Sequence, residues 1–287
     1  MSRNCPVAFA TGRLFCLDEP SAEEVASFHR DGFIVYPDVC TDEAREGLIE
    51  EVLSYDPVAE LLNSATKSAD GQYFFERPWN NRGPWGHALI DAPFVQALLR
   101  ATVKNPIQFC HSALNVALRG VDRVRYHMDH HHWVHENPVN IAERDGYYIQ
   151  ILYYPNGFRC GDRSLSIIPG SHKVAPTSVV TPERLLSGDY DEEAGRRLEE
   201  RALELPPGSM VYLNARVFHG VEPKPLDTKQ DYRIFVIDIF KEAGPPHRHT
   251  QVISDEWMAQ ANPVRRQLFD RDPYTEGCWE SQLRPRY

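Results

Sequence analysis

The chain has 287 residues, of which 42% are hydrophobic and 25% charged, the ordinary composition of a globular protein with a sizeable core. Its formal net charge of −10, without any run of basic residues, argues against a nucleic-acid partner. The six cysteines are scattered without a CxxC pair, and neither a secretory signal nor a membrane-spanning apolar run is visible, so we expect a cytoplasmic protein that binds no membrane.

The first third of the chain, about residues 20–103, is expected to form a layer of helices. Ser21 and Glu24 match a capping box, in which each side chain accepts a hydrogen bond from the other residue's backbone N–H. From Thr41 onward, apolar residues recur at three- and four-residue spacing, which is typical of an amphipathic helix. The predicted elements are helices over residues 21–30, from 41 and over 92–103, and a strand over 33–36.

Residues 64–88 show little periodicity but contain several aromatic side chains among Gly, Pro and Asn. We expect a long, aromatic-rich loop. Phe75, Trp79 and Trp85 are candidates for a lid over a substrate. The alternative is a loop that packs on the protein through its own aromatic side chains.

From about residue 106 to 240 the sequence is rich in strand-forming residues separated by turn residues, which predicts a β core. Residues 181–203 are expected to form a polar helical insert, and residues 241–287 a C-terminal extension with a helix near 254–261. The whole chain, 1–287, is interpreted as one domain, mainly β with flanking helices. The predicted strands are 107–118, 123–129, 147–154, 165–168, 210–213 and 233–240.

Three residues form a candidate metal site. His127 and Asp129 lie two residues apart in a predicted strand, so their side chains can point to one face and bind one ion. His219 follows another strand, and Gly220 after it permits a close approach of the backbone. Two histidines and one carboxylate are the facial triad of non-haem Fe(II) oxygenases. Taken singly, each element has a structural alternative: a solvent-facing edge strand for the pair, and a buried structural histidine for His219.

Other polar residues are candidates for binding a co-substrate or a substrate. Arg233 begins an apolar strand, where a guanidinium can bind a carboxylate through two parallel hydrogen bonds, although a surface arginine is the alternative. Asn115 and Gln150 interrupt apolar strands, either as co-substrate contacts or as buried amides that satisfy the backbone. His132 belongs to a run of histidines, for which there are three interpretations: a second metal site, the wall of a substrate pocket, or a polar loop.

Between about residues 21 and 240, the chain resembles the phytanoyl-CoA dioxygenase family of Fe(II)/2-oxoglutarate-dependent oxygenases. Five elements in one order carry the resemblance: residues 26–37, Thr41-Asp-Glu-Ala, Tyr126-His-Met-Asp129, Ser164-Leu-Ser-Ile-Ile-Pro-Gly-Ser-His-Lys173, and Gly208-Ser-Met-Val-Tyr-Leu with His219, Gly220 and Arg233. Three positions depart from the family pattern: the interval from Gly220 to Tyr232 is longer, Val221 replaces a small hydroxyl residue, and Gly161-Asp-Arg-Ser164 replaces Glu-Asn-Gly.

The resemblance implies a double-stranded β-helix, the jelly roll of cupin-like proteins. It implies Fe(II) held by His127, Asp129 and His219, and 2-oxoglutarate paired with Arg233. The implied reaction uses O2, converts 2-oxoglutarate to succinate and CO2, and oxidises a C–H bond of a small molecule. Relatives that halogenate have a small residue at the position of Asp129, so the carboxylate here favours hydroxylation.

Two other classes of protein are compatible with the histidines. One is a non-catalytic jelly-roll protein that binds a metal or another ligand, and the other is a cupin-type metalloenzyme that does not use 2-oxoglutarate. Neither needs an arginine beside the metal, so Arg233 discriminates between them and the oxygenase. The partner is expected to be a small molecule, and the protein to be a monomer or a homodimer.

Overall fold

Two antiparallel sheets form the centre of the molecule. The computed structural model describes residues 12–63, 72–75, 83–103, 106–129, 148–174, 179–242, 259 and 261–269, and only the backbone of 72–75. The larger sheet has six strands in the order β1-β8-β5-β10-β3-β2, and the smaller has four in the order β4-β9-β6-β7. The strands are β1 (Phe33–Tyr36), β2 (Gln72–Phe75), β3 (Ile107–Leu118), β4 (Val124–His127), β5 (Tyr148–Tyr154), β6 (Leu165–Ile167), β7 (Arg201–Ala202), β8 (Ser209–Asn214), β9 (His219–Val221) and β10 (Tyr232–Glu242).

The strand β10 is the central element of the large sheet, because it pairs with β3 along its whole length and with β5 along half of it. Alternate residues along β10 point to opposite faces. Ile237 and Ile239 point inward and pack against Leu165 of the small sheet, together with other apolar side chains. The two sheets thus enclose a common interior. This confirms the predicted jelly roll, a mainly β fold with flanking helices.

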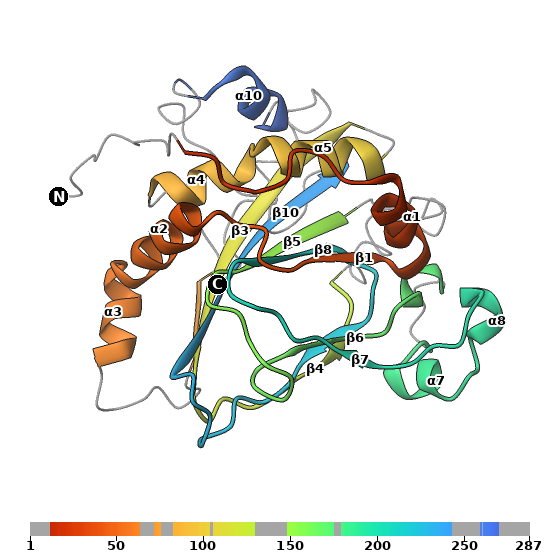
Figure 1. The fold of residues 1–287 in the computed structure, drawn as a ribbon. Helices are drawn as coiled ribbons and strands as arrows, with labels where there is room; N and C mark the ends of the chain where they lie inside the picture. Colours follow the sequence, from red (N-terminus) through yellow and green to blue (C-terminus); the bar gives the residue numbers. More distant parts are fainter. Residues whose placement is uncertain are drawn as a thin grey trace, which may run out of the picture.

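The outer face of the large sheet is covered by helices (Figure 1). Val236 and Phe240 of β10 belong to the same apolar cluster as Phe28, Leu48 and Leu98 from three of these helices. Burial of this face explains why the strands of the large sheet are apolar on both sides. The helices on this side are α1 (Ala22–Asp31), α2 (Asp42–Leu53), α3 (Asp56–Asn63), α4 (Pro84–Ile90), α5 (Pro93–Thr102) and α10 (Pro263–Phe269).

The helix α1 has the predicted capping box. The Ser21 hydroxyl accepts a hydrogen bond from the Glu24 N–H at 3.2 Å, and the Glu24 carboxylate accepts one from the Ser21 N–H at 2.7 Å. Gly32 ends the helix with a φ of 85°, and a Cβ there would lie 2.4 Å from a methyl group of Val217. Position 32 therefore requires glycine, because the backbone there is left-handed and a larger residue would clash with Val217.

The prediction of a loop over residues 64–88 is wrong for two described parts of it, because they form β2 and α4. Pro84 occupies the first turn of α4. The N-cap residue is Gly83, which has no side chain to accept a hydrogen bond from the first backbone N–H groups of the helix. Instead, the carboxylate of Glu51 in α2 accepts hydrogen bonds from the N–H groups of Trp85 (2.8 Å) and Gly86 (3.1 Å). Because this cap comes from a distant residue, local sequence did not reveal it.

The predicted helical insert at 181–203 contains two short helices, α7 (Pro182–Leu186) and α8 (Asp191–Ala194), followed by extended chain that leads into β7. The helix predicted near 254–261 falls almost entirely outside the described residues. The next helix, α10, is anchored to α4 by a buried ion pair of Arg265 with Asp91 at 2.6 Å. Among the helices of the described residues, none is long and apolar enough to cross a membrane.

Candidate metal centre

The structure brings His127, Asp129 and His219 together inside the jelly roll, at one end of the small sheet. His127 is the last residue of β4, His219 is the first of β9, and the two are directly paired across the strands. One ligand atom from each of the three residues lies within 4.8 Å of the others. The pairing of β4 with β9 thus brings His127 and His219, which are 92 positions apart in the sequence, into one cluster.

Both histidines present the same ring nitrogen to this cluster. The Nδ1 atom of His127 lies 2.8 Å from the Arg125 carbonyl oxygen, and that of His219 lies 2.9 Å from the Val217 carbonyl oxygen. Each Nδ1 can therefore carry the proton and donate it to the backbone, which leaves the Nε2 lone pair for a metal. The Nε2 atoms lie 3.6 Å and 3.4 Å from the two oxygens of Asp129.

The carboxylate of Asp129 is held by its neighbours. The Gln150 amide donates a hydrogen bond to its Oδ2 at 2.5 Å, and the backbone N–H of Asp129 donates to the Ala215 carbonyl at 3.0 Å. Burial acts to raise the pKa of Asp129, but the charge and hydrogen bond of His219, helped by Gln150, hold that pKa well below its usual range. An ionised carboxylate between two imidazoles is a favourable site for a cation.

The three side chains of the site differ in their exposure. The His219 side chain is 7% exposed, whereas those of His127 and Asp129 are 37% and 36% exposed. An ion here would be held from the interior and would keep coordination positions free on the exposed side. The strands β4 and β9 can pack this closely because residue 220 is glycine: a Cβ there would lie 3.0 Å from the Val124 carbonyl oxygen.

Arg233 lies in the interior as well, at the start of β10. It is 1% exposed, which excludes the alternative of a surface arginine. One Nη donates to the Arg163 carbonyl at 2.5 Å, and the other lies 3.4 Å from the Asn115 amide oxygen. Burial lowers the pKa of Arg233 from 12.5 to about 10. The aromatic rings of Tyr154, Phe158 and Phe235 surround its guanidinium at 5.0–5.9 Å.

The other predicted site residues are divided between several places. The Asn115 amide oxygen lies near Arg233, and the Gln150 amide donates to Asp129. A contact of either amide with a co-substrate stays a prediction. Trp85 is partly buried against the apolar cluster on the outer face of the large sheet, and its role in a lid stays a prediction. Phe75 lies in β2, of which only the backbone is described, and Trp79 and His132 lie outside the described residues.

Two residues next to the candidate site residues are not among those predicted from the sequence. Arg163, at a position that departs from the family pattern, is 2% exposed, and its carbonyl accepts a hydrogen bond from Arg233. Ser171, in the segment Ser164–Lys173, accepts a hydrogen bond from the Phe218 N–H at 2.8 Å. This bond fixes the residue that precedes His219. For Gln150, the sequence does give an indication, because it is a single amide in an otherwise apolar strand and its side chain binds Asp129.

No protein-family model matches this chain, and no curated protein sequence matches it. Solved structures do match over most of its length. It is similar to the non-heme alpha ketoglutarate dependent carbocyclase SnoK from nogalamycin biosynthesis, with a TM-score of 0.58 and 16% identity, covering 78% of this chain and 85% of that chain. It is similar to the epimerase SnoN from the same biosynthesis, with a TM-score of 0.57, 14% identity, and coverage of 77% and 82%.

A third similar structure is HygX from Streptomyces hygroscopicus, solved with nickel and 2-oxoglutarate bound. Its TM-score is 0.57 at 15% identity, and the match covers 79% of this chain and 90% of that chain. At identities this low, the similarity establishes a common fold. The fold is therefore one that enzymes of epimerisation and cyclisation share, and it leaves the reaction of this chain open.

Proposed function

We propose that this protein is a non-haem Fe(II)/2-oxoglutarate-dependent oxygenase that oxidises a C–H bond of a small molecule, with hydroxylation as the favoured outcome. The observation that carries the proposal is the presence of two complementary sites in one interior. Two imidazoles and a carboxylate can hold a divalent metal, and a buried guanidinium can hold a carboxylate. The similar structures named above support the same class, as does the sequence resemblance to the phytanoyl-CoA dioxygenase family.

The residues fit both groups. The donor set of two nitrogens and one oxygen, with open positions, suits Fe(II). The Nε of Arg233 is buried and has no hydrogen-bond partner in the described part of the chain. A carboxylate is the natural acceptor for such an orphaned donor, because leaving it unsatisfied in the interior is unfavourable. Fe(II) with 2-oxoglutarate, when bound, supplies the activation of O2, and 2-oxoglutarate is converted to succinate and CO2.

The protein's own contribution is binding, orientation and the exclusion of water. The Nδ1 atoms of the two histidines donate to backbone carbonyl oxygens, which would orient the two Nε2 atoms toward a bound metal. Gln150 holds one oxygen of Asp129, which leaves the other free for the ion. Around the guanidinium of Arg233, three aromatic rings remove water and so strengthen its attraction for a carboxylate.

The proposed substrate is a small organic molecule. One of the similar structures has hygromycin B bound together with nickel and 2-oxoglutarate, and another has a nogalamycin compound. Both ligands are complex natural products, and we extend this ligand class to the present protein. A metalloenzyme that does not use 2-oxoglutarate is less favoured, because it gives no role to a fully buried arginine. The retained Asp129 favours oxidation over halogenation.

The proposal is tested by measuring succinate formation and O2 uptake with Fe(II), 2-oxoglutarate and a panel of natural-product substrates. We expect succinate formation that depends on iron and rises when a productive substrate is added. Asp129→Ala should abolish it, whereas Asp227→Ala, which changes an exposed carboxylate in a different loop, should leave it intact. Absence of 2-oxoglutarate turnover in the iron-loaded wild-type protein, with and without the panel, would refute the proposal.

A further inference from the structure

Arg163 occupies a strained backbone position beside Arg233. It lies just before β6 with a φ of 58°, in the left-handed region that residues other than glycine, asparagine and aspartate rarely adopt. Holding an arginine there costs on the order of 1 kcal/mol relative to glycine. A strained residue whose side chain is also fully buried requires a reason for its presence.

The contacts of Arg163 join three segments at the end of the jelly roll. Its N–H donates to the Pro223 carbonyl at 3.0 Å, and its guanidinium donates to the carbonyl of Asp122 and lies 3.4 Å from that of Glu222. Asp122 precedes β4, and Glu222 follows β9. Arg163 therefore ties β4 and β9 together at the ends opposite His127 and His219.

The same residue fixes Arg233. In the left-handed conformation, the Arg163 carbonyl accepts a hydrogen bond from an Nη of Arg233 at 2.5 Å. This bond sets the direction of the Arg233 guanidinium and leaves its Nε free to donate to a ligand. A change in the backbone at Arg163 would rotate this planar group, and a carboxylate bound to it would move accordingly.

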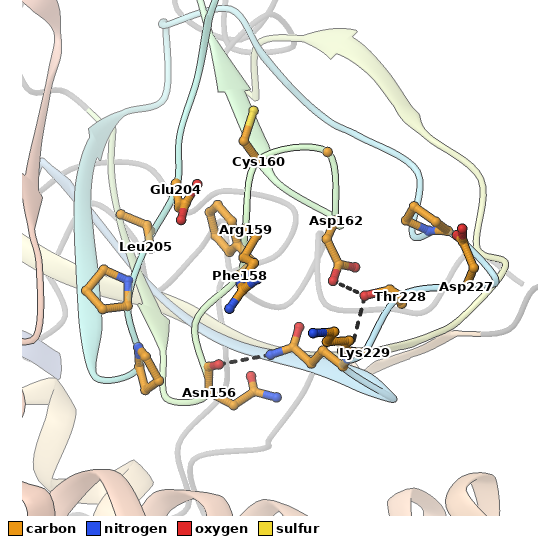
Figure 2. Close-up of a pocket in the computed structure, with 15 residues that line it drawn as sticks. Asn156, Phe158, Arg159, Cys160, Asp162, Glu204, Leu205, Asp227, Thr228 and Lys229 are labelled. Atoms are coloured by element: carbon orange, nitrogen blue, oxygen red, sulfur yellow. Dashed lines mark hydrogen bonds between the residues drawn. The ribbon is translucent and has the colours of Figure 1, made fainter.

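The charges at this end of the interior favour an anion. The buried Lys224 is neutralised by Asp162 at 2.7 Å, and Asp162 also binds Thr228 (Figure 2). Arg163 and Arg233 are neighbouring buried cations, and the charge of Asp162 acts on Arg233 as well. Burial, and then the charge of Arg233, lower the pKa of Arg163 from 12.5 to about 10, although the exposed Asp122 offsets part of this effect. A carboxylate bound at Arg233 would relieve the repulsion.

We propose that Arg163 is a positioning residue for the co-substrate carboxylate: it orients the guanidinium of Arg233 and adds a second positive charge behind it. The inference rests on the proposed function and deepens it, because it assigns co-substrate affinity to a pair of arginines. It also gives a role to the departure of Gly161-Asp-Arg-Ser164 from the family pattern. Both backbone and side chain of Arg163 act on the site, so they must be separated experimentally.

Arg163→Gly separates them, since glycine keeps the left-handed backbone and its carbonyl but removes the charge. Arg163→Lys keeps the charge. The readout is the dissociation constant of 2-oxoglutarate in an anaerobic titration of the Fe(II)-loaded full-length protein. Loss of one nearby unit charge at an effective dielectric constant of about 20 should raise this constant about tenfold in Arg163→Gly. Arg163→Lys should restore most of the affinity.

A merely structural role would have other consequences. We expect KM for 2-oxoglutarate to rise in Arg163→Gly while kcat at saturating 2-oxoglutarate and the affinity for Fe(II) stay within about twofold of wild type. A 2-oxoglutarate affinity equal to wild type, or an equal loss of iron affinity, would overturn the proposal. Should Arg163→Gly fail to fold, Arg163→Gln is judged by the same criteria. If wild type itself binds no 2-oxoglutarate, the proposed function fails first, and this inference fails with it.

Discussion

Replacing Arg233 by methionine should make the protein more stable and at the same time unable to bind 2-oxoglutarate. Methionine has a similar volume and packs well against aromatic rings such as Tyr154, Phe158 and Phe235. The pKa of Arg233 falls from 12.5 to about 10, which corresponds to about 3 kcal/mol against the charged form in the folded state. Relief of this unfavourable charge burial is the stabilising effect.

The loss of a hydrogen bond offsets part of the stabilisation expected for Arg233→Met. The substitution leaves the buried Arg163 carbonyl without its donor, which costs about 1–2 kcal/mol. We therefore expect a net rise of about 1–2 kcal/mol in the free energy of unfolding. Binding of 2-oxoglutarate should weaken at least a hundredfold, because a buried, hydrogen-bonded charge pair contributes about 2–5 kcal/mol or more when one partner is truncated.

The assay pairs urea unfolding with an anaerobic 2-oxoglutarate titration on the same preparation. Arg184→Met is a matched control, because Arg184 is half-exposed and its ion pair with Asp189, its hydrogen bond to the Val179 carbonyl and its contact with the Tyr190 ring are all surface contacts. It should change stability by less than about 0.5 kcal/mol. A marked loss of stability in Arg233→Met would show that the guanidinium is a structural element. Unchanged 2-oxoglutarate affinity would show that it is not the co-substrate ligand.

Three further substitutions test other parts of the structure. Gln150→Leu removes the donor to Asp129 and should lower iron affinity about tenfold or more, measured by competition with a chelator. Asp238→Asn removes a fully buried carboxyl whose pKa is raised well above its usual range by burial. The folded state keeps a proton that the unfolded chain releases above about pH 4, so wild-type stability falls as pH rises, and the variant should lose this dependence in urea titrations at pH 6 and 9. Gly32→Ala places a methyl group against Val217 at a positive φ and should cost about 2–3 kcal/mol in the same titrations.

Each of these has a contrary outcome. Unchanged iron affinity in Gln150→Leu would mean that the backbone alone orients Asp129. Parallel pH slopes for wild type and Asp238→Asn would assign the titration to another group. For Gly32, the comparison is Gly161→Ala, which also has a positive φ but meets no atom within 4 Å, and should therefore cost only about 1 kcal/mol. Equal losses at both glycines would remove the packing component.

Elements with a strong local signal were predictable from the sequence. The capping residues Ser21 and Glu24 placed α1, and a long apolar run placed β3 with the bounds that the structure shows. The jelly roll, however, came from the resemblance to a family and not from periodicity. Two very short strands were missed: β9 has three residues and β7 has two, too few to show an alternating pattern.

The metal-ligand candidates were predictable because His127 and Asp129 lie two residues apart in one motif, although the strand β4 ends at His127 and Asp129 lies just beyond it. Their neighbours depend on tertiary contacts that no local pattern contains. The Gln150 side chain reaches from β5 of the large sheet to Asp129, which lies just beyond β4 of the small sheet. Trp85 packs against the cluster on the outer face of the large sheet. Arg163 was visible only as an unexpected residue in a loop. Its positive φ and its contact with Arg233 became evident in three dimensions alone.

The central claim is that one interior holds both Fe(II) and 2-oxoglutarate through His127, Asp129, His219 and Arg233. Its most direct test is the visible spectrum of the full-length protein under anaerobic conditions near pH 7 as Fe(II) and 2-oxoglutarate are added together. We predict a metal-to-ligand charge-transfer band that saturates with 2-oxoglutarate in wild type and is absent in His219→Ala. No band in wild type would contradict the claim, and a band retained in His219→Ala would contradict the assignment of the ligands.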